Sequence, residues 1–296
     1  MKQTKLTGYL LGVAGMLMLS LTLIALKFGL ESFSPIVMSL GRVIPASIVA
    51  VIALRTMRAR LLPPKEDLVR VLGLTIGVVI AFPVITSYGL EHITPGQAGV
   101  LGALGPIITA ALSVLYGHKH PGRIFWIASS LGTLSAIGFA LTRSADDPGD
   151  GDLLWYGLML LAVVLWCWGQ VTGGTLTGKH HSIQILAWAI LLGTPINALI
   201  TGVDLWINPL TEWPTLSAWF GFLYVALVSM FLVFFVWYAA MDRIGMVKTS
   251  QLQLVQPIIT LVLSIWLFGE QVAPSTWVFA VLIMAAVAWT QSIRRG

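Results

Sequence analysis

Residues 251–270 read QLQLVQPIITLVLSIWLFGE, an apolar run that carries three glutamines and a proline. A helix needs roughly 20 mostly apolar residues to cross the hydrocarbon core of a membrane, and this run is of that length. Its tetrapeptide PIIT, at 257–260, also occurs at 106–109. The stretch therefore predicts both a membrane-spanning helix and an internal repeat.

Comparable apolar runs recur along the whole chain. Of its 296 residues 57% are hydrophobic and 10% are charged, a composition outside the range of soluble domains. The runs are continuous, whereas the strands of a membrane β-barrel alternate. We expect an all-α integral membrane protein with ten spans, at 6–29, 34–54, 68–90, 95–117, 122–142, 153–176, 182–204, 215–239, 248–269 and 274–293.

The positive charges predict the orientation of these spans. With the N-terminus in the cytoplasm, 14 of the 17 Lys and Arg residues fall at inner helix ends and termini, as the positive-inside rule requires. Both termini are then cytoplasmic, and the expected location is the inner (plasma) membrane, crossed many times. The net charge of +5 thus reflects the orientation of the spans in the membrane. The basic residues are scattered over many loops, which argues against nucleic-acid binding.

The repeated tetrapeptide indicates a duplication. A shift of 151 residues places 106–109 on 257–260 and Ser113 on Ser264. Five helices in each half is an odd number, so the second half must run with inverted topology, as in many secondary transporters. We expect one transporter domain over 1–296, with repeats at 1–145 and 152–296.

The ten-span layout, the Gly41-Arg42 pair and the pattern from Pro257 to Gly269-Glu270 resemble the EamA-like branch of the drug/metabolite transporter superfamily. The resemblance covers essentially the whole chain. It implies export or exchange of small metabolites and no enzymatic activity. The first repeat departs from the pattern, since residues 117–119 read Gly-His-Lys where an acidic residue would match Glu270.

Polar residues within the spans are the first candidates for a substrate site. Gln253 and Gln256 are three residues apart and share a helix face. An amide that faces lipid lacks hydrogen-bond partners, so both should face a cavity or a neighbouring helix. A charge as deep as that of Arg42 must face the protein, where it could bind a substrate carboxylate or be held by helix carbonyls.

Aromatic residues and prolines are the second group of candidates. Tyr88, Trp166, Trp168 and Tyr238 combine flat apolar faces with a polar edge, which suits stacking on a substrate, although packing would also explain them. Pro106 and Pro257 occupy equivalent places in the repeats. They are either tolerated kinks or hinges for alternating access.

Several absences narrow the function. No Asp or Glu lies at mid-depth in a span, so exchange of a proton for a cationic drug lacks its usual carboxylate, and only Glu31 and Glu270 remain as proton carriers. No HExxH motif, Walker loop or metal-ligand spacing occurs, so we expect no enzyme, cofactor or metal. Four histidines, His118, His120, His180 and His181, are expected to be solvated loop residues.

We therefore expect a secondary carrier for an amino acid or related zwitterion, working by alternating access around a central cavity. Its partners would be a small-molecule substrate and membrane lipids, and it would function as a monomer. Gly73 and Gly77 have the spacing of a helix-dimer motif, but packing within the chain is the preferred interpretation. Two alternatives stay open, an exporter of lipophilic cations that depends on Glu270 and a membrane scaffold that transports nothing.

Overall fold

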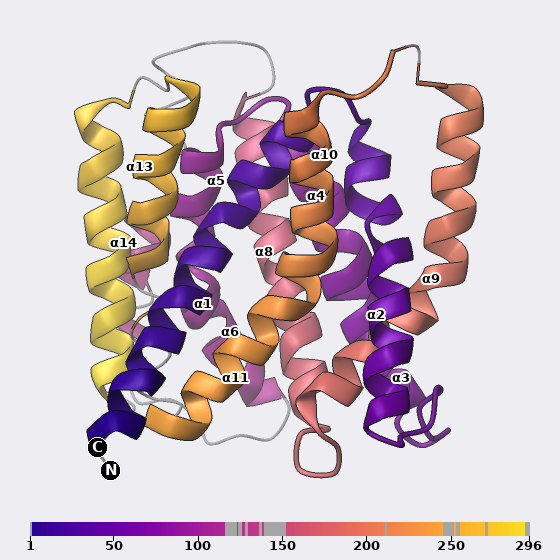
Figure 1. Ribbon diagram of the computed structural model, residues 1–296. Helices are drawn as coiled ribbons and strands as arrows, with labels where there is room; N and C mark the ends of the chain where they lie inside the picture. Colours follow the sequence, from indigo (N-terminus) through magenta and orange to yellow (C-terminus); the bar gives the residue numbers. More distant parts are fainter. Residues whose placement is uncertain are drawn as a thin grey trace. The chain divides into compact units, whose positions relative to one another are not determined.

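A computed structural model describes residues 2–115, 152–210, 212–244, 255–269 and 272–293, together with 123, 126–127, 130–135, 138 and 252. Every regular element within these residues is helical (Figure 1). Six helices there are long and apolar enough to cross a membrane, namely Lys5–Gly29, Val37–Thr56, Leu68–Gly89, Leu153–Gly174, Ser182–Ile207 and Leu216–Trp237. The all-helical membrane class is thus confirmed.

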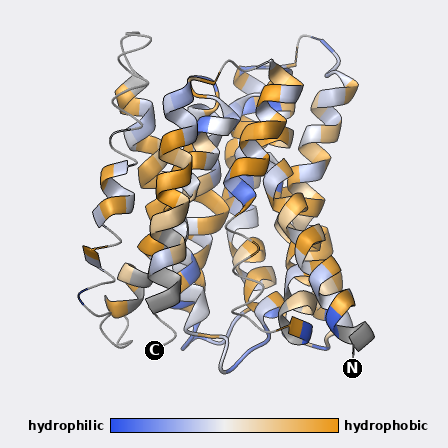
Figure 2. Ribbon diagram, turned by 90° about the vertical axis from the view of Figure 1, so that its left-hand side faces the viewer, coloured by the Kyte–Doolittle hydropathy of each residue, from blue (hydrophilic) through white to orange (hydrophobic). Residues whose placement is uncertain are grey.

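The count of ten spans and the cytoplasmic termini stay predictions, because the spans expected at 122–142 and 248–269 fall partly outside the described residues. Apolar residues run along the helices, and hydrophilic ones collect mostly in loops and at helix ends (Figure 2). This distribution is what the continuous apolar runs of the sequence predict.

The chain forms two compact units. Unit 1 comprises Met1–Ile24, Gly89–Val164 and Val236–Gly296, and unit 2 comprises Ala25–Tyr88 and Leu165–Phe235. Each unit takes segments from both expected repeats, so neither repeat is a compact unit by itself.

Unit 2 is built around the pairing of α2 with α9. Its elements are η1 (Val37–Gly41), α2 (Val43–Thr56), α3 (Leu68–Leu74), η2 (Thr75–Ala81), α4 (Phe82–Gly89), α9 (Ser182–Ile207), α10 (Leu216–Leu223) and η3 (Tyr224–Leu232), with the adjoining ends of α1 (Lys2–Gly29), α8 (Asp152–Gly174) and α11 (Val233–Ile244). Figure 1 shows α2 beside α9. The small residues Ala46 and Ala50 of α2 and Ala189 of α9 are fully buried, which lets helix backbones approach closely.

Three segments of unit 2, η1, η2 and η3, are π-helical. Pro45 follows η1 by four residues and Pro83 follows η2 by two. Proline has no N–H and clashes with the carbonyl one turn earlier, so the regular α-helical bonding cannot continue through it. The wider π turn accommodates this interruption, and both spans continue as α-helices beyond their prolines.

Glycines allow the closest helix contacts of unit 2. A Cβ on Gly77 of η2 would overlap the backbone oxygen of Leu165 and lie 2.9 Å from Cα of Gly169 in α8. One turn earlier, a Cβ on Gly73 would lie 2.8 Å from Cγ2 of Thr172. The structure thus uses this glycine pair for packing within the unit.

Unit 1 contains most of α1 (Lys2–Gly29) and of α8 (Asp152–Gly174), together with α5 (Pro95–Gly102), α6 (Gly105–Leu115), α11 (Val233–Ile244), α13 (Gln256–Phe268) and α14 (Pro274–Ile293). Helix α5 packs on α13. A reciprocal capping box starts α5, in which the Thr94 side chain accepts from the N–H of Gln97 and the Gln97 side chain accepts from the N–H of Thr94.

The span expected at 95–117 is interrupted, because α5 ends at Gly102 and α6 begins at Gly105. Pro106 therefore lies in the first turn of α6, and Pro257 lies in the first turn of α13. At such positions the missing N–H costs no helical hydrogen bond, so the two prolines start helices instead of kinking them. Helix α13 ends at Gly269, whose φ of 63° is a left-handed conformation that favours glycine.

Candidate functional site

A polar stripe on α9 faces η1 and η2 within unit 2. Gly193, Asn197 and Thr201 follow one another at intervals of four residues, so they share one helix face. A Cβ on Gly193 would lie 3.2 Å from Cγ2 of Thr75 in η2, and a Cβ on Gly41 of η1 would lie 3.1 Å from Cγ2 of Thr201. Thr201 therefore packs against the residue that precedes Arg42.

Three buried side chains in this region, Arg42, Asn197 and Thr201, have polar atoms without hydrogen-bond partners, and we call them the Arg42 cluster. Asn197 is 0% exposed and leaves both Nδ2 and Oδ1 unpaired, while Thr201 leaves Oγ1 unpaired. Arg42 is 7% exposed, as its depth in the sequence predicted, and its Nε is unpaired. Each buried unsatisfied group costs about 1–3 kcal/mol, so such a set is unusual unless a ligand completes it.

The carboxylates of the described residues leave Arg42 without an ion pair. The next carboxylate along α9 is that of Asp204, which accepts hydrogen bonds from Ser34 Oγ and, at 3.1 Å, from Asn208 Nδ2. Arg42 forms no ion pair with any described residue. A buried cation without a counter-charge is costly, so the cluster is suited to an anionic group.

A second polar set lies in unit 1, where α1 meets α13. Thr260 Oγ1 donates to the backbone oxygen of Ser20 at 3.1 Å, and Ser20 Oγ donates to the backbone oxygen of Met16 at 2.9 Å. The backbone oxygen of Gln256 lies 3.5 Å from Ser20 Oγ, and the residue is half-buried. A Cβ on Gly99 of α5 would lie 3.2 Å from Cγ2 of Thr260, which makes this a tight, mostly satisfied helix contact.

The aromatic candidates of unit 2 line no described cavity. The ring of Trp166 lies 6.0 Å from that of Phe82, and Trp166 and Trp168 are half-buried. Tyr88 is 37% exposed. These observations fit packing as well as stacking on a substrate.

The other predicted residues are divided between the units. Arg42, Tyr88, Trp166 and Trp168 belong to unit 2, while Pro106, Tyr238, Gln256 and Pro257 belong to unit 1. Gln253 and Glu270 lie outside the described residues, as do the side chains of Pro106 and Tyr238.

Asn197 and Thr201 were not predicted from the sequence as site residues. The chain has only two asparagines, and Asn197 is the one inside an apolar span. Its neighbours on the same helix face are Gly193 and Thr201, four residues away on either side. This spacing of small and polar residues is the signal that could have identified the stripe.

At the opposite end of α9, the loops before α3 and before α9 are joined through Asp67. Its buried carboxylate accepts a 2.8 Å hydrogen bond from His180 Nε2 and lies 3.7 Å from Lys179 Nζ. The hydrogen bond from His180, followed by the positive charge of Lys179, lowers the pKa of Asp67 below its usual value. The expectation of solvated histidines is therefore wrong for His180, which also packs edge-on against Trp188.

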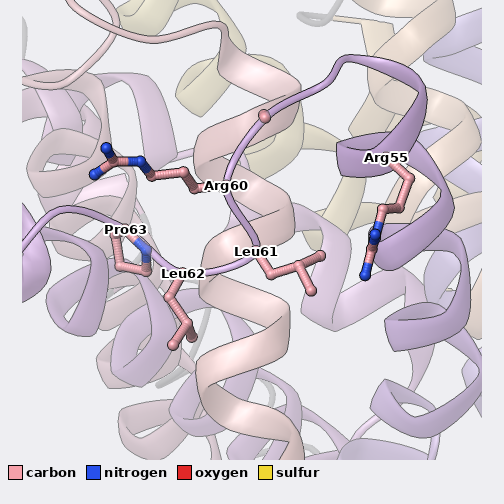
Figure 3. A pocket seen from close by; sticks show the side chains of 6 residues that line it. Arg55, Arg60, Leu61, Leu62 and Pro63 are labelled. Atoms are coloured by element: carbon pink, nitrogen blue, oxygen red, sulfur yellow. The ribbon is translucent and has the colours of Figure 1, made fainter.

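An open pocket of about 590 Å³ lies in the loop after α2. It is lined by Arg55, Ala59, Arg60, Leu61, Leu62 and Pro63. Figure 3 shows the guanidinium groups of Arg55 and Arg60 directed away from each other, so they do not form a two-point anion site.

The described residues contain no group of three or more side chains that could hold a metal ion.

The model of the EamA-like transporter family matches residues 6–141 and again 153–291. The chain is 31% identical over 290 residues to "Uncharacterized transporter YdeK" of Bacillus subtilis, covering 97% of each protein. It is 24% identical to "Uncharacterized inner membrane transporter YedA" of Escherichia coli K12, covering 90% of this chain and 84% of that protein.

A further relative is the "Probable terminal-alkyne amino-acid exporter" of Streptantibioticus cattleyicolor, 24% identical over 89% of this chain and 86% of that protein. A solved crystal structure, 16% identical, matches 96% of this chain and 97% of its own with a TM-score of 0.63, which supports the fold. The chain belongs to the EamA-like transporter family and is a transporter-type protein of the inner membrane.

Proposed function

We propose that this protein is a secondary carrier that exports or exchanges an amino acid or related zwitterion by alternating access, working as a monomer. The observation that carries the proposal is the Arg42 cluster, a buried cation in the same unit as a buried amide and hydroxyl whose polar atoms are also unpaired. Such polar groups within the membrane are retained at a cost in stability and mark solute pathways.

The comparisons support the same substrate class. One relative carries the name of an amino-acid exporter, and the family consists of transporters, which argues against an enzyme. The buried charged residues within the described spans include Arg42 but no carboxylate. A carrier for lipophilic cations would place a carboxylate there, so a zwitterion or neutral solute fits better.

Alternating access between two inverted halves is supported by the symmetry of the described segments. The family model matches the chain twice, once in each half. Shifted by 151 residues, the segment 25–88 of unit 2 covers 176–239, which overlaps most of the unit's other segment, 165–235. The same shift moves η2 (75–81) to 226–232, inside η3.

Within this mechanism we assign substrate contacts to Arg42 and Gln256, with Gln253 as a third polar contact. Tyr88, Trp166, Trp168 and Tyr238 would contact the apolar part of the solute. Pro106 and Pro257 would act as hinges, since each lies in the first turn of its helix.

Counterflow in proteoliposomes tests this function. Vesicles are preloaded with one unlabelled amino acid or one lipophilic cation at a time, and uptake of the labelled compound is followed with and without a pH gradient. Exchange of amino acids without a need for the gradient supports the proposal. Exchange limited to lipophilic cations and driven by the gradient would favour the drug-exporter alternative, and silence for both classes would favour the scaffold.

A further inference from the structure

The unpaired atoms of the Arg42 cluster form a specific set of donors and acceptors. Arg42 Nε, Asn197 Nδ2 and Thr201 Oγ1 can each donate a hydrogen bond, and Asn197 Oδ1 can only accept one. Three donors and a positive charge match the two oxygens of a carboxylate. The amide oxygen of Asn197, which can only accept, matches an ammonium group beside it.

We propose that Arg42, Asn197 and Thr201 together bind the head group of an α-amino acid, with the carboxylate on Arg42 and Thr201 and the ammonium on Asn197 Oδ1. This inference rests on the proposed function and deepens it, because it defines which part of the solute is recognised. These three residues would not contact the apolar side chain of the solute.

The spacing within the fold agrees with a single small ligand. Asn197 and Thr201 are four residues apart on one helix face, where Cβ atoms are about 5–6 Å apart, close enough for one head group to reach both. Thr201 packs against Gly41, which directly precedes Arg42. Gly41 thus places the start of α2 close to the stripe that carries Asn197 and Thr201.

The alternative is that these polar groups are unsatisfied and bind no ligand. It predicts that their removal leaves solute binding unchanged. In that case Asn197→Leu and Thr201→Val, which keep the number and branching of the side-chain heavy atoms, would remove unpaired polar atoms without any loss of binding. With a ligand site, the same two changes leave the ligand-free protein as stable as before or more stable, and each weakens ligand binding.

Thermal unfolding of the purified full-length protein, followed by tryptophan fluorescence, measures binding without requiring transport. The amino acid that gives the largest rise in unfolding temperature among the common twenty is chosen as the probe. Its decarboxylated amine and its deaminated acid are then compared with it, and sodium chloride is tested separately in a buffer otherwise free of small anions. Ligands that bind the folded state raise the midpoint in a concentration-dependent way.

We expect the amino acid to raise the midpoint, the amine to have no effect and the acid to act only at higher concentration. Asn197→Leu and Thr201→Val should each weaken the apparent affinity by about tenfold or more, as expected for loss of a hydrogen bond to a charged group. The control is Thr194→Val on the same helix, where the lost hydroxyl is bonded to the backbone oxygen of Ile190 at 2.8 Å. It should leave the affinity unchanged.

A single shared site also predicts coupling. In an Arg42→Gln background, Thr201→Val should cause little further loss, because both residues hold the same carboxylate. Equal shifts with the amine, shifts from chloride alone, or affinities unchanged in both α9 variants would overturn the inference. Counterflow that persists in those variants would leave the carrier function standing without this site, whereas head-group binding without any exchange would leave the site and remove the function.

Discussion

Gly77 provides a quantitative test of the packing in unit 2. A methyl group in Gly77→Ala would overlap the backbone oxygen of Leu165 and lie 2.9 Å from Cα and 3.0 Å from N of Gly169. These are backbone atoms of α8, which cannot rotate away as a side chain could. Relieving the overlap requires the helices to move apart, and overpacking of this kind costs about 1–3 kcal/mol.

A matched control separates this cost from helix propensity. Alanine favours a helix over glycine by about 1 kcal/mol, and a Cβ on Gly202 of α9 would meet nothing within 4 Å. Gly202→Ala should therefore be neutral or stabilising, whereas Gly77→Ala should lower the unfolding temperature by several degrees, at about 2–4 °C per kcal/mol. Thermal unfolding followed by tryptophan fluorescence measures both, and a midpoint for Gly77→Ala at or above that of Gly202→Ala would refute the close helix contact.

Three further changes test other parts of the structure. Asp67→Asn removes the negative charge that His180 and Lys179 face and should lower the unfolding temperature near neutral pH. Because the pKa of Asp67 is lowered in the folded state, the stability that its charge contributes is present above the unfolded pKa of about 3.9 and is lost as the pH falls further. The difference in unfolding temperature between variant and wild type should therefore narrow only below about pH 4. Gly269→Ala should cost about 1–2 kcal/mol in the same assay, since the left-handed φ of 63° opposes a side chain and a Cβ there meets no described atom within 4 Å; a neutral result would argue against that turn. Trp188→Phe leaves the backbone oxygen of Arg60 without its 2.7 Å hydrogen bond and should lower the free energy of unfolding by about 1–3 kcal/mol. An unchanged unfolding temperature would mean that solvent replaces the indole N–H.

The spans were largely predictable because a helix buried in a membrane needs a continuous run of apolar residues, which is visible in the sequence without knowledge of the fold. The expected helix at 274–293 has the bounds of α14, and the one expected at 182–204 ends three residues before α9 does. The break between α5 and α6 was not predictable in this way. Residues 102–105 read Gly-Ala-Leu-Gly, which is as apolar as the helices on either side.

The candidate site was predictable only in part, because charge is visible in a sequence and pairing is not. Arg42 stood out since a buried cation is expensive wherever it lies. Asn197 and Thr201 are ordinary helix residues until the structure shows that their polar atoms lack partners. The prediction that His180 is solvated was wrong for the same reason, since its hydrogen-bond partner Asp67 lies 113 residues away in the chain.

The most direct test of the carrier proposal compares initial rates of amino-acid counterflow in proteoliposomes for wild type, Asn197→Leu and the control Thr194→Val. We expect exchange by wild type and by Thr194→Val at similar rates. Asn197→Leu should lose about tenfold or more in rate, although that variant should unfold at the same temperature as wild type or higher. Wild-type rates in a stable Asn197→Leu protein would contradict the assignment of Asn197 to the solute site, and a lack of exchange by wild type would contradict the carrier proposal itself.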